Sequence, residues 1–300
     1  MPTPARPATL LYNAAAGSQR RASPAGLHHA LLDADYDAEV WLTTSPEDVV
    51  ERLPYITGTL FIAGGDGTLR AAALHALNRP DLVLGVLPLG TANNVARAWN
   101  AMGDPLEVAR SYRDAYPAPF DVGRVRGQWG EDHFLEACGC GLFAEVLDDY
   151  NPHAPKSPVR ALGSVFEALT TLNPLGVRVT VDGAPVSSPP VVLLEVMNTP
   201  STGNGLHLAP RATPGDGQLD LVRVEAAHHL SLVHYGRAIL GGTFDTLPGV
   251  STCTGRSFTV ADQGQVFHVD TDLRRSHESG GTVQIDVLPG ALSVLCPVAG

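Results

Sequence analysis

Residues 64–68 read Gly-Gly-Asp-Gly-Thr and stand directly between a predicted strand, Thr59 to Ala63, and a predicted helix, Leu69 to Leu77. The three glycines let the backbone approach a ligand closely, so that amide groups and the helix N-terminus can face a phosphate. Asp66 would repel a phosphate unless a divalent cation lay between them. The segment therefore predicts a nucleotide together with Mg²⁺. The alternative is a tight turn in which Asp66 caps the helix.

Two further loops have residues suited to phosphate binding. Residues 88–94 read Pro-Leu-Gly-Thr-Ala-Asn-Asn at another strand-to-helix junction, and residues 13–17 read Asn-Ala-Ala-Ala-Gly after the first predicted strand. Gly90 permits a turn, and Thr91 either caps the following helix or holds a phosphate oxygen. Each loop alone is ordinary, but three of them at one edge of one sheet favour a shared site.

The elements that must position these loops alternate between strand and helix patterns over residues 8–100, which is typical of an α/β domain with a parallel sheet. All three loops follow strands, and ligands bind outside the carboxyl ends of the strands in such sheets. From residue 120 onward, short strands separated by turn residues predict a mostly β, sandwich-like second domain. The predicted strands are 8–12, 38–42, 59–63, 82–87, 120–125, 133–138, 177–181, 191–197, 219–224, 257–260, 266–269 and 282–287, and the predicted helices are 24–33, 46–53, 69–77, 92–99, 105–116, 159–172 and 230–240.

Composition and charge disfavour two classes of protein, nucleic-acid binders and membrane-spanning proteins. The 300 residues include 31 acidic and 20 basic ones, and the net charge of −11 has the wrong sign for a nucleic-acid binder. The longest apolar runs, such as Leu82 to Val86, are too short for a transmembrane segment. Because Met1 to Thr9 lacks the pattern of a secretory signal, we expect a cytoplasmic protein.

Four strings together resemble the diacylglycerol kinase-like lipid kinases, the family that includes the sphingosine and ceramide kinases. They are residues 13–17, 64–69 (Gly-Gly-Asp-Gly-Thr-Leu), 88–93 (Pro-Leu-Gly-Thr-Ala-Asn) and 215–220 (Gly-Asp-Gly-Gln-Leu-Asp). The resemblance implies an ATP- and Mg²⁺-dependent kinase that phosphorylates a lipid hydroxyl, of diacylglycerol or a related lipid. It also implies an α/β nucleotide-binding domain at 1–119, a β-sandwich-like substrate and metal domain at 120–290, and a C-terminal segment, 291–300, that returns to the first domain.

The same resemblance implies roles for individual residues. Thr43 joins the nucleotide site because it stands five residues before Asp48, although Thr44 could substitute for it. A Mg²⁺ site is implied at Thr213, Asp216 and Gln218, with a plain Asp-Gly hairpin turn as the alternative. The implied nucleotide-binding residues are Asn13, Ala14, Ala15, Ala16, Gly17, Thr43, Gly64, Gly65, Asp66, Gly67, Thr68, Leu69, Arg70 and Thr91, and the implied catalytic carboxylates are Asp66 and Asp272.

The sequence departs from the family pattern at residues 270–272, which read Asp-Thr-Asp where the family usually reads Asp-Gly-Glu. Asp272 keeps the carboxylate that a general base requires, with a reach shorter by about 1.5 Å. Thr271 is β-branched and tolerates positive φ poorly, should the turn require it. Four interpretations stay open: the loop has readjusted around Asp272, Asp270 acts instead, activity is weak or absent, or the segment is only a solvated acidic turn.

Two other functions remain as alternatives. An NAD kinase-like enzyme also uses Gly-Gly-Asp-Gly-Thr, and a catalytically weak nucleotide- or lipid-binding protein would explain the altered 270–272 segment. A lipid substrate implies a membrane surface, which at this net charge predicts weak, transient contact through arginines such as Arg20, Arg21, Arg274 and Arg275. An apolar stripe in the predicted helix 159–172 could dock on that surface or pack in the core. The sequence leaves a homodimer open.

Overall fold

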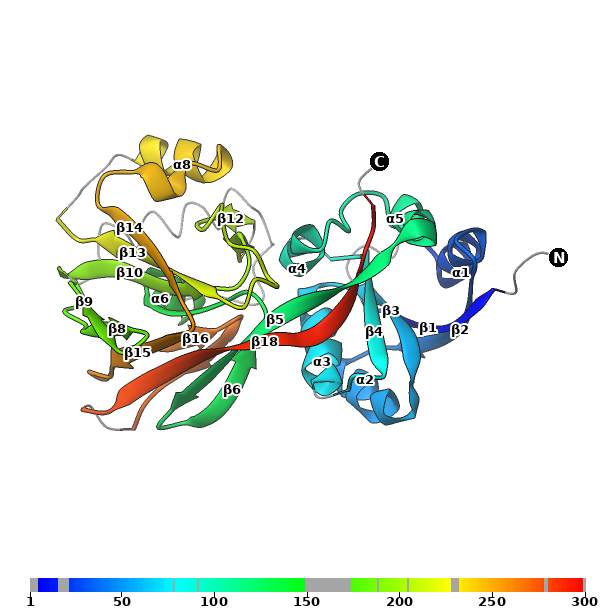
Figure 1. Ribbon diagram of the computed structural model, residues 1–300, viewed down its shortest axis with the longest axis horizontal. Helices are drawn as coiled ribbons and strands as arrows, with labels where there is room; N and C mark the ends of the chain where they lie inside the picture. Colours follow the sequence, from blue (N-terminus) through cyan, green and yellow to red (C-terminus); the bar gives the residue numbers. More distant parts are fainter. Residues whose placement is uncertain are drawn as a thin grey trace. The chain divides into compact units, whose positions relative to one another are not determined.

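The structure, a computed structural model, describes residues 5–15, 22–77, 79–90, 92–148, 174–187, 189–203, 205–227, 232–277 and 280–298. The chain divides into two compact units (Figure 1). The first unit comprises Met1–Phe120 and Gly290–Gly300, and the second comprises Asp121–Pro289. Two strands, β5 (Tyr116–Gly127) and β18 (Thr282–Cys296), contribute residues to both units.

The first unit is an α/β domain around a parallel sheet with strand order β2-β1-β3-β4. Val294 of β18 extends this sheet by pairing in parallel with Leu84 of β4. Helices lie on both sides of the sheet (Figure 1). The strands are β1 (Arg6–Asn13), β2 (Tyr36–Thr43), β3 (Gly58–Gly64) and β4 (Leu82–Pro88), and the helices are α1 (Pro24–Asp33), α2 (Pro46–Arg52), η1 (Leu53–Tyr55), α3 (Asp66–Ala76), α4 (Asn94–Ala98), α5 (Pro105–Ser111) and η2 (Tyr112–Asp114).

Side-chain caps followed by proline start three of these helices. Ser23 caps α1 by accepting from the Gly26 amide, and α1 spans the predicted residues 24–33. Ser45 and Asp48 form a capping box at α2, and Asp104 accepts from two amides of α5. Because proline has no amide to leave unbonded and its φ already suits a helix, each start is well defined by local sequence.

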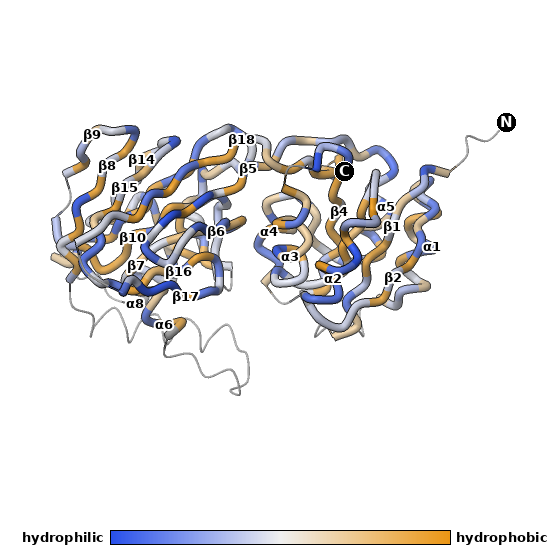
Figure 2. The backbone as a smooth tube through the Cα atoms, turned by 90° about the horizontal axis from the view of Figure 1, so that it is seen from below, coloured by the Kyte–Doolittle hydropathy of each residue, from blue (hydrophilic) through white to orange (hydrophobic). Residues whose placement is uncertain are grey.

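The core of the first unit is built on β3 and β4, which are buried along most of their length. Figure 2 shows β4 as a mainly hydrophobic segment. The ring of Phe61 lies between those of Tyr36 and Tyr112, with centroid distances of 4.9 and 5.1 Å. A Cβ atom on Gly85 would lie 2.5 Å from the Phe61 ring, so β4 needs glycine where β3 carries its largest side chain.

The second unit is a sandwich of antiparallel strands. One sheet has the order β14-β13-β10-β7-β16-β17, and in the other β18 pairs with β15, β15 with β8, and β8 with β9, while β5 pairs with both β18 and β6. Leu194 and Phe267 of the first sheet pack with Phe258 and Ile285 of the second in one buried cluster. The strands are β6 (Gly130–Phe134), β7 (Ala137–Gly141), β8 (Val179–Val181), β9 (Ala184–Val186), β10 (Val191–Met197), β13 (Leu219–Glu225), β14 (Val250–Gly255), β15 (Ser257–Ala261), β16 (Phe267–Val269) and β17 (Asp272–Arg274).

Shorter elements complete the second unit. A second buried cluster covers the other face of the six-stranded sheet, where Phe143 of α6 (Leu142–Asp148) and Tyr235 of α8 (Leu232–Leu240) pack with Val222 of β13. The remaining elements are β11 (Ser201–Thr202), β12 (Leu206–His207) and η3 (Phe244–Thr246). Within the described ranges, no helix combines the length and the apolar character needed to span a bilayer.

The fold class agrees with the prediction from sequence, an α/β domain followed by a mostly β, sandwich-like one, but several element boundaries differ. The helix predicted from Leu69 begins at Asp66, and the strand predicted at 133–138 is interrupted between Phe134 and Ala137. The last strand, predicted to end at 287, continues to Cys296. The predicted helix 159–172 lies outside the described residues.

Candidate functional site

The Gly-Gly-Asp-Gly-Thr segment joins β3 to α3. Gly65 is the N-cap residue of α3 and Asp66 is its first helical residue, with no side-chain cap. The alternative in which Asp66 caps this helix is therefore wrong. The Asp66 Oδ2 atom instead accepts a hydrogen bond of 2.9 Å from the Asn93 amide, in the loop after β4. Gly67 is exposed, and a Cβ atom there would meet no described residue within 4 Å, so the first turn of α3 is open on that side as far as the described part of the chain shows.

The loop after β4 lies against the loop after β3 at two glycines. A Cβ atom on Gly90 would be only 2.7 Å from the Gly65 Cα atom, so this approach requires glycine. Asn93, at a φ of 51°, closes its own loop, because its Oδ1 atom accepts from the Gly90 amide and its Nδ2 atom donates to the Gly90 carbonyl, both at 2.9 Å. Asn93 and Asp66 thus set the spacing of the two loops.

The end of β1 joins the same cluster through Asn13. The Asn13 Nδ2 atom donates to the Thr68 hydroxyl at 2.7 Å, and its Oδ1 atom accepts from the Ala15 amide at 2.8 Å. A Cβ atom on Gly64 would lie 2.7 Å from the Thr68 Cβ atom, so glycine is needed there as well. The structure therefore brings the ends of β1, β3 and β4 together at one edge of the sheet.

Thr43 ends β2 beside this cluster. It is buried, its carbonyl accepts from the Ala14 amide at 2.8 Å, and its hydroxyl donates to the Tyr12 carbonyl at 3.4 Å. Thr44 is exposed, and both its amide and its hydroxyl donate to Asp48 at 2.7 Å. Thr44 is thus part of the α2 cap, while Thr43 borders the Asn13 loop. Leu69 is buried and Arg70 half-buried on α3; Ala16, Gly17 and Thr91 lie outside the described residues.

The loop expected to hold a metal lies in the second unit before β13. Thr213, Asp216 and Gln218 are all exposed, and Gly215 and Gly217 have φ values of 130° and 75°. The Asp216 Oδ1 atom accepts from the Gln218 amide at 2.9 Å, and the Asp216 amide donates to the Thr213 carbonyl at 3.3 Å. The Asp216 carboxylate and the carbonyls of Thr213 and Gln218 are all oxygen donors, the type that a hard cation such as Mg²⁺ or Ca²⁺ requires.

Negative charge also gathers beside this loop. Burial and, to a lesser degree, the Asp216 carboxylate raise the pKa of Asp220 to about 6, and Arg211 opposes the shift. A divalent cation at Asp216 would relieve this repulsion. Within the described part of the chain, no three His, Cys, Asp or Glu side chains gather into a metal cluster, so backbone carbonyls would supply much of the coordination.

Two residues that the sequence reading did not single out brace this loop. Asp121, 1% exposed, accepts from the Gly215 and Gly217 amides at 3.0 and 2.7 Å. Asn198 donates through Nδ2 to the Asp121 carbonyl at 2.8 Å, and its buried Oδ1 atom has no hydrogen-bond partner among the described residues. For Asp121, the available signal was a carboxylate between Phe120 and Val122 in the predicted strand 120–125.

Asp270 and Thr271 form a two-residue hairpin turn between β16 and β17, and Val269 pairs with Asp272, the first residue of β17. The positive φ, 51°, falls on Asp270 and not on Thr271, so the β-branched residue carries no such strain. The buried Asp270 carboxylate accepts from the amides of Leu135, Glu136 and Ala137 at 3.1, 2.9 and 3.3 Å. These bonds occupy both carboxylate oxygens and favour a structural role for Asp270 over that of a base.

Asp272 has the more accessible carboxylate of the turn. Its side chain is 45% exposed, and its Oδ2 atom lies 3.6 Å from the Arg274 Nη2 atom. Arg274 also pairs with Asp132 of β6, which holds the guanidinium beside the turn. A carboxylate so placed can orient a hydroxyl and accept its proton.

Comparison with known families decides where the chain belongs. Residues 7–125 match the model of the diacylglycerol kinase catalytic domain, and residues 145–296 match the YegS C-terminal NAD kinase beta sandwich-like domain. The chain belongs to the diacylglycerol kinase-like family of lipid kinases. The resemblance to this family that the four sequence strings predict is confirmed, as is the prediction that the protein is an enzyme of the kinase class.

Relatives of this lipid kinase are similar to it over most of their own length and of its length. A diacylglycerol kinase of Mycobacterium tuberculosis (strain CDC 1551 / Oshkosh) is 29% identical over 247 residues, which cover 81% of this chain and 78% of the relative. A probable lipid kinase YegS-like of Pseudomonas aeruginosa (strain PAO1) is 30% identical over 263 residues, covering 83% and 80%. A crystal structure of a putative diacylglycerol kinase from Bacillus anthracis str. Sterne shares the fold, with a TM-score of 0.74, 21% identity and coverage of 99% and 97%.

Proposed function

We propose that this lipid kinase transfers the γ-phosphoryl group of ATP to a lipid hydroxyl, that of diacylglycerol or a related lipid, with Mg²⁺ as cofactor. The observation that carries the proposal is the Asp66–Asn93 bond, which ties the Gly-Gly-Asp-Gly-Thr loop to the loop after β4 beside the open first turn of α3. Relatives named as diacylglycerol kinase and probable lipid kinase support the acceptor class.

In this proposal the chain's own residues divide the work. Loop amides and the N-terminus of α3 bind the phosphates, Asn13 and Asn93 hold the loops in place, and Asp66 faces the cation that accompanies the nucleotide. Asp272 orients the lipid hydroxyl and accepts its proton. Asp216, with the carbonyls of Thr213 and Gln218, would hold Mg²⁺, which supplies charge neutralisation when bound.

We assign these roles to domains at residues 1–119, for the nucleotide, and 120–290, for lipid and metal, with residues 291–300 completing the first. We also infer a cytoplasmic enzyme that touches the membrane transiently, because ATP is available in the cytoplasm and the lipid is in the membrane. At a net charge of −11, sedimentation with anionic vesicles should be weak and salt-sensitive. Tight, salt-independent sedimentation would contradict this inference.

The test is Mg²⁺-dependent transfer of labelled phosphate from ATP to diacylglycerol, phosphatidylglycerol, sphingosine or ceramide in mixed micelles, with NAD as a soluble acceptor. Transfer to a lipid by the wild type, lost in Asp66→Ala, is the expected result. Transfer to NAD alone would support the NAD kinase-like alternative. ATP binding without transfer to any acceptor would indicate a nucleotide- or lipid-binding protein.

A further inference from the structure

A carboxylate and an imidazole are buried together in the middle of the six-stranded sheet. Glu195 of β10 and His268 of β16 both pair with Gly139, which lies between them on β7. Their exposed fractions are 0% and 1%. The His268 Nε2 atom lies 2.9 and 2.8 Å from the two Glu195 carboxylate oxygens.

Gly139 makes this contact possible. A Cβ atom on it would lie 2.5 Å from the Glu195 Cδ atom and 2.2 Å from the Leu194 carbonyl oxygen. The two side chains therefore meet across a strand only because the residue between them has no side chain.

The other ring nitrogen of His268 points to the 270–272 turn. Its Nδ1 atom lies 2.9 Å from the Asp270 carbonyl oxygen. A carbonyl can only accept, so Nδ1 carries a proton, and Glu195 on the far side of the ring fixes that orientation. Burial lowers the pKa of His268, but the Glu195 carboxylate and Asp270 together raise it above its ordinary value, while burial raises the pKa of Glu195.

The amide, the carboxylate and the carbonyl of Asp270 all make hydrogen bonds. Its amide donates to the Ala137 carbonyl at 2.8 Å, its carboxylate accepts from the three amides of residues 135–137, and its carbonyl accepts from His268. Asp270 and Thr271 are the two turn residues, and Asp272 is the next residue along the chain. Restraint of Asp270 therefore sets the direction in which Asp272 leaves the turn.

A contribution to the stability of the fold is a poor explanation for the buried Glu195–His268 pair. Replacing a buried ion pair by apolar residues of similar volume is often neutral or stabilising, because both charges lose their hydration. A precise backbone position beside a reacting group is a different requirement, since a displacement of about 1 Å can change a rate on the order of a hundredfold.

We propose that Glu195 and His268 are positioning residues, which hold the Asp270 carbonyl so that the turn presents the Asp272 carboxylate to the lipid hydroxyl. This inference rests on the proposed function, in which Asp272 accepts the proton of that hydroxyl. Neither residue touches a substrate; both act through the backbone of the turn.

Two substitutions of His268 separate the two contacts of the ring. In His268→Gln the amide nitrogen takes the place of Nε2, so the bond to Glu195 is kept and the bond to the Asp270 carbonyl is lost. In His268→Asn the amide nitrogen takes the place of Nδ1, so the bond to Asp270 is kept and Glu195 loses its partner. The unfolding midpoint, kcat, KM for ATP and amide hydrogen exchange of residues 270–275 are measured for both, on the lipid that the wild type phosphorylates best.

We expect activity and stability to change in opposite order. His268→Gln should lower kcat on the order of ten- to a hundredfold with KM for ATP unchanged and speed exchange at Thr271 and Asp272. It should lower the midpoint by less than His268→Asn does, because the group that loses its partner is a carbonyl and not a carboxylate. His268→Asn should lower the midpoint by several degrees, because Glu195 is left buried without a partner, yet keep most of the kcat. Glu195→Gln, whose amide can donate to Nε2 of the same tautomer, should also keep kcat.

The opposite result is equally clear. Two outcomes would overturn the inference and show that the pair is only structural. In the first, kcat follows the unfolding midpoint, so that His268→Asn is the less active variant. In the second, His268→Gln keeps the wild-type kcat and the wild-type rate of amide exchange. If the wild type transfers phosphate to no lipid, the proposed function fails and the positioning role fails with it. Wild-type activity therefore tells the two failures apart.

Discussion

Gly90 and Gly67 allow the same small change, glycine to alanine, to be made on the two sides of the candidate phosphate site. A Cβ atom on Gly90 would stand 2.7 Å from the Gly65 Cα atom and 2.6 Å from the Asn93 Oδ1 atom, whereas ordinary contacts begin at 3.4 Å. Gly90→Ala must therefore push the two loops apart by about 0.7 Å. A Cβ atom on Gly67 would have no neighbour within 4 Å among the residues that the structure describes.

The two variants should differ in which property they change. Gly90→Ala should lower the free energy of unfolding by about 1–3 kcal/mol, the usual result of overpacking between backbone segments. It should also weaken ATP binding, because the loop amides no longer converge. Gly67→Ala, in the first turn of α3, should be neutral or slightly stabilising, since alanine favours a helix over glycine by about 1 kcal/mol.

ATP binding to Gly67→Ala is the decisive measurement. If phosphates bind where the first turn of α3 faces open space, the added methyl group occupies part of that space, and calorimetric titration should show affinity reduced at least tenfold in a fully folded protein. Wild-type ATP affinity in Gly67→Ala would refute the placement of the phosphates at this loop. An unchanged midpoint in Gly90→Ala would refute the close approach of the two loops.

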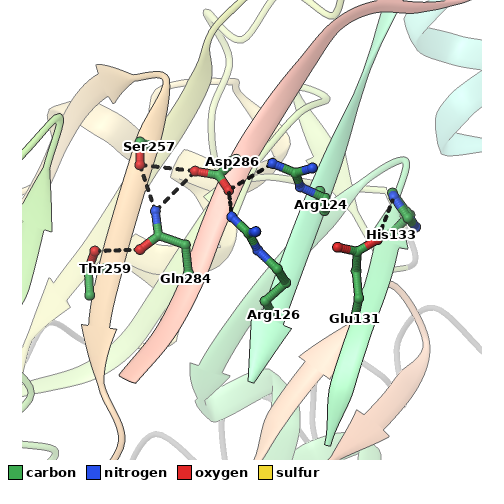
Figure 3. Close-up of polar contacts among 8 residues, drawn as sticks. All are labelled: Arg124, Arg126, Glu131, His133, Ser257, Thr259, Gln284 and Asp286. Atoms are coloured by element: carbon green, nitrogen blue, oxygen red, sulfur yellow. Dashed lines mark hydrogen bonds and ion pairs between the residues drawn. The ribbon is translucent and has the colours of Figure 1, made fainter. Parts of the chain in front are cut away.

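Two more predictions concern the second unit. The Asp286 carboxylate accepts hydrogen bonds from Ser257, Gln284, Arg124 and Arg126 (Figure 3). Burial raises the pKa of Asp286, but these bonds together lower it by more. The stability that the bonds contribute is therefore present above the usual aspartate pKa and is lost as pH falls through the lowered pKa. At pH 7 the free energy of unfolding of Asp286→Asn should be about 1 kcal/mol below that of the wild type, a small value because both arginines are partly exposed. The difference should shrink toward pH 3, and an equal difference at both pH values would contradict this prediction. For the loop of residues 213–218, the candidate Mg²⁺ site, Mg²⁺ at a hundred times its Kd should stabilise the wild type by about 2.7 kcal/mol, and Asp216→Ala should abolish the rise in unfolding midpoint. The same rise in both proteins would place the cation elsewhere.

Local sequence predicted much of the first unit because its signals are local. Ser23-Pro24 and Ser45-Pro46 mark helix starts through bonds that span three residues, and β1, β3 and β4 are apolar runs bounded by glycine or polar loops. The three loops lie together at one edge because a parallel sheet collects the carboxyl ends of its strands. The start of α3 was missed by three residues, since glycine at 65 and 67 hides a helical turn whose Asp66 bonds to the next loop rather than to its own.

The second unit was predicted less well because its constraints cross the sequence. The strand expected at 133–138 is interrupted where the amides of residues 135–137 turn to the Asp270 carboxylate, 134 residues from Glu136. No periodicity in either segment signals that bond. The same holds for Asp121, which braces the loop of residues 213–218 from 96 residues away, as its bond to the Gly217 amide shows.

The sequence alone predicts which groups this lipid kinase offers for chemistry: glycine loops after strands for phosphate, and carboxylates at Asp66, Asp216 and Asp272. Residue type and local spacing are enough for that, because loop conformation and charge are local properties. Only the tertiary structure decided which carboxylates are occupied by backbone amides and which stay accessible. Asp270 and Asp272 stand two residues apart in the same turn, yet one is buried under three amides and the other is 45% exposed, a difference made by segments more than a hundred residues away.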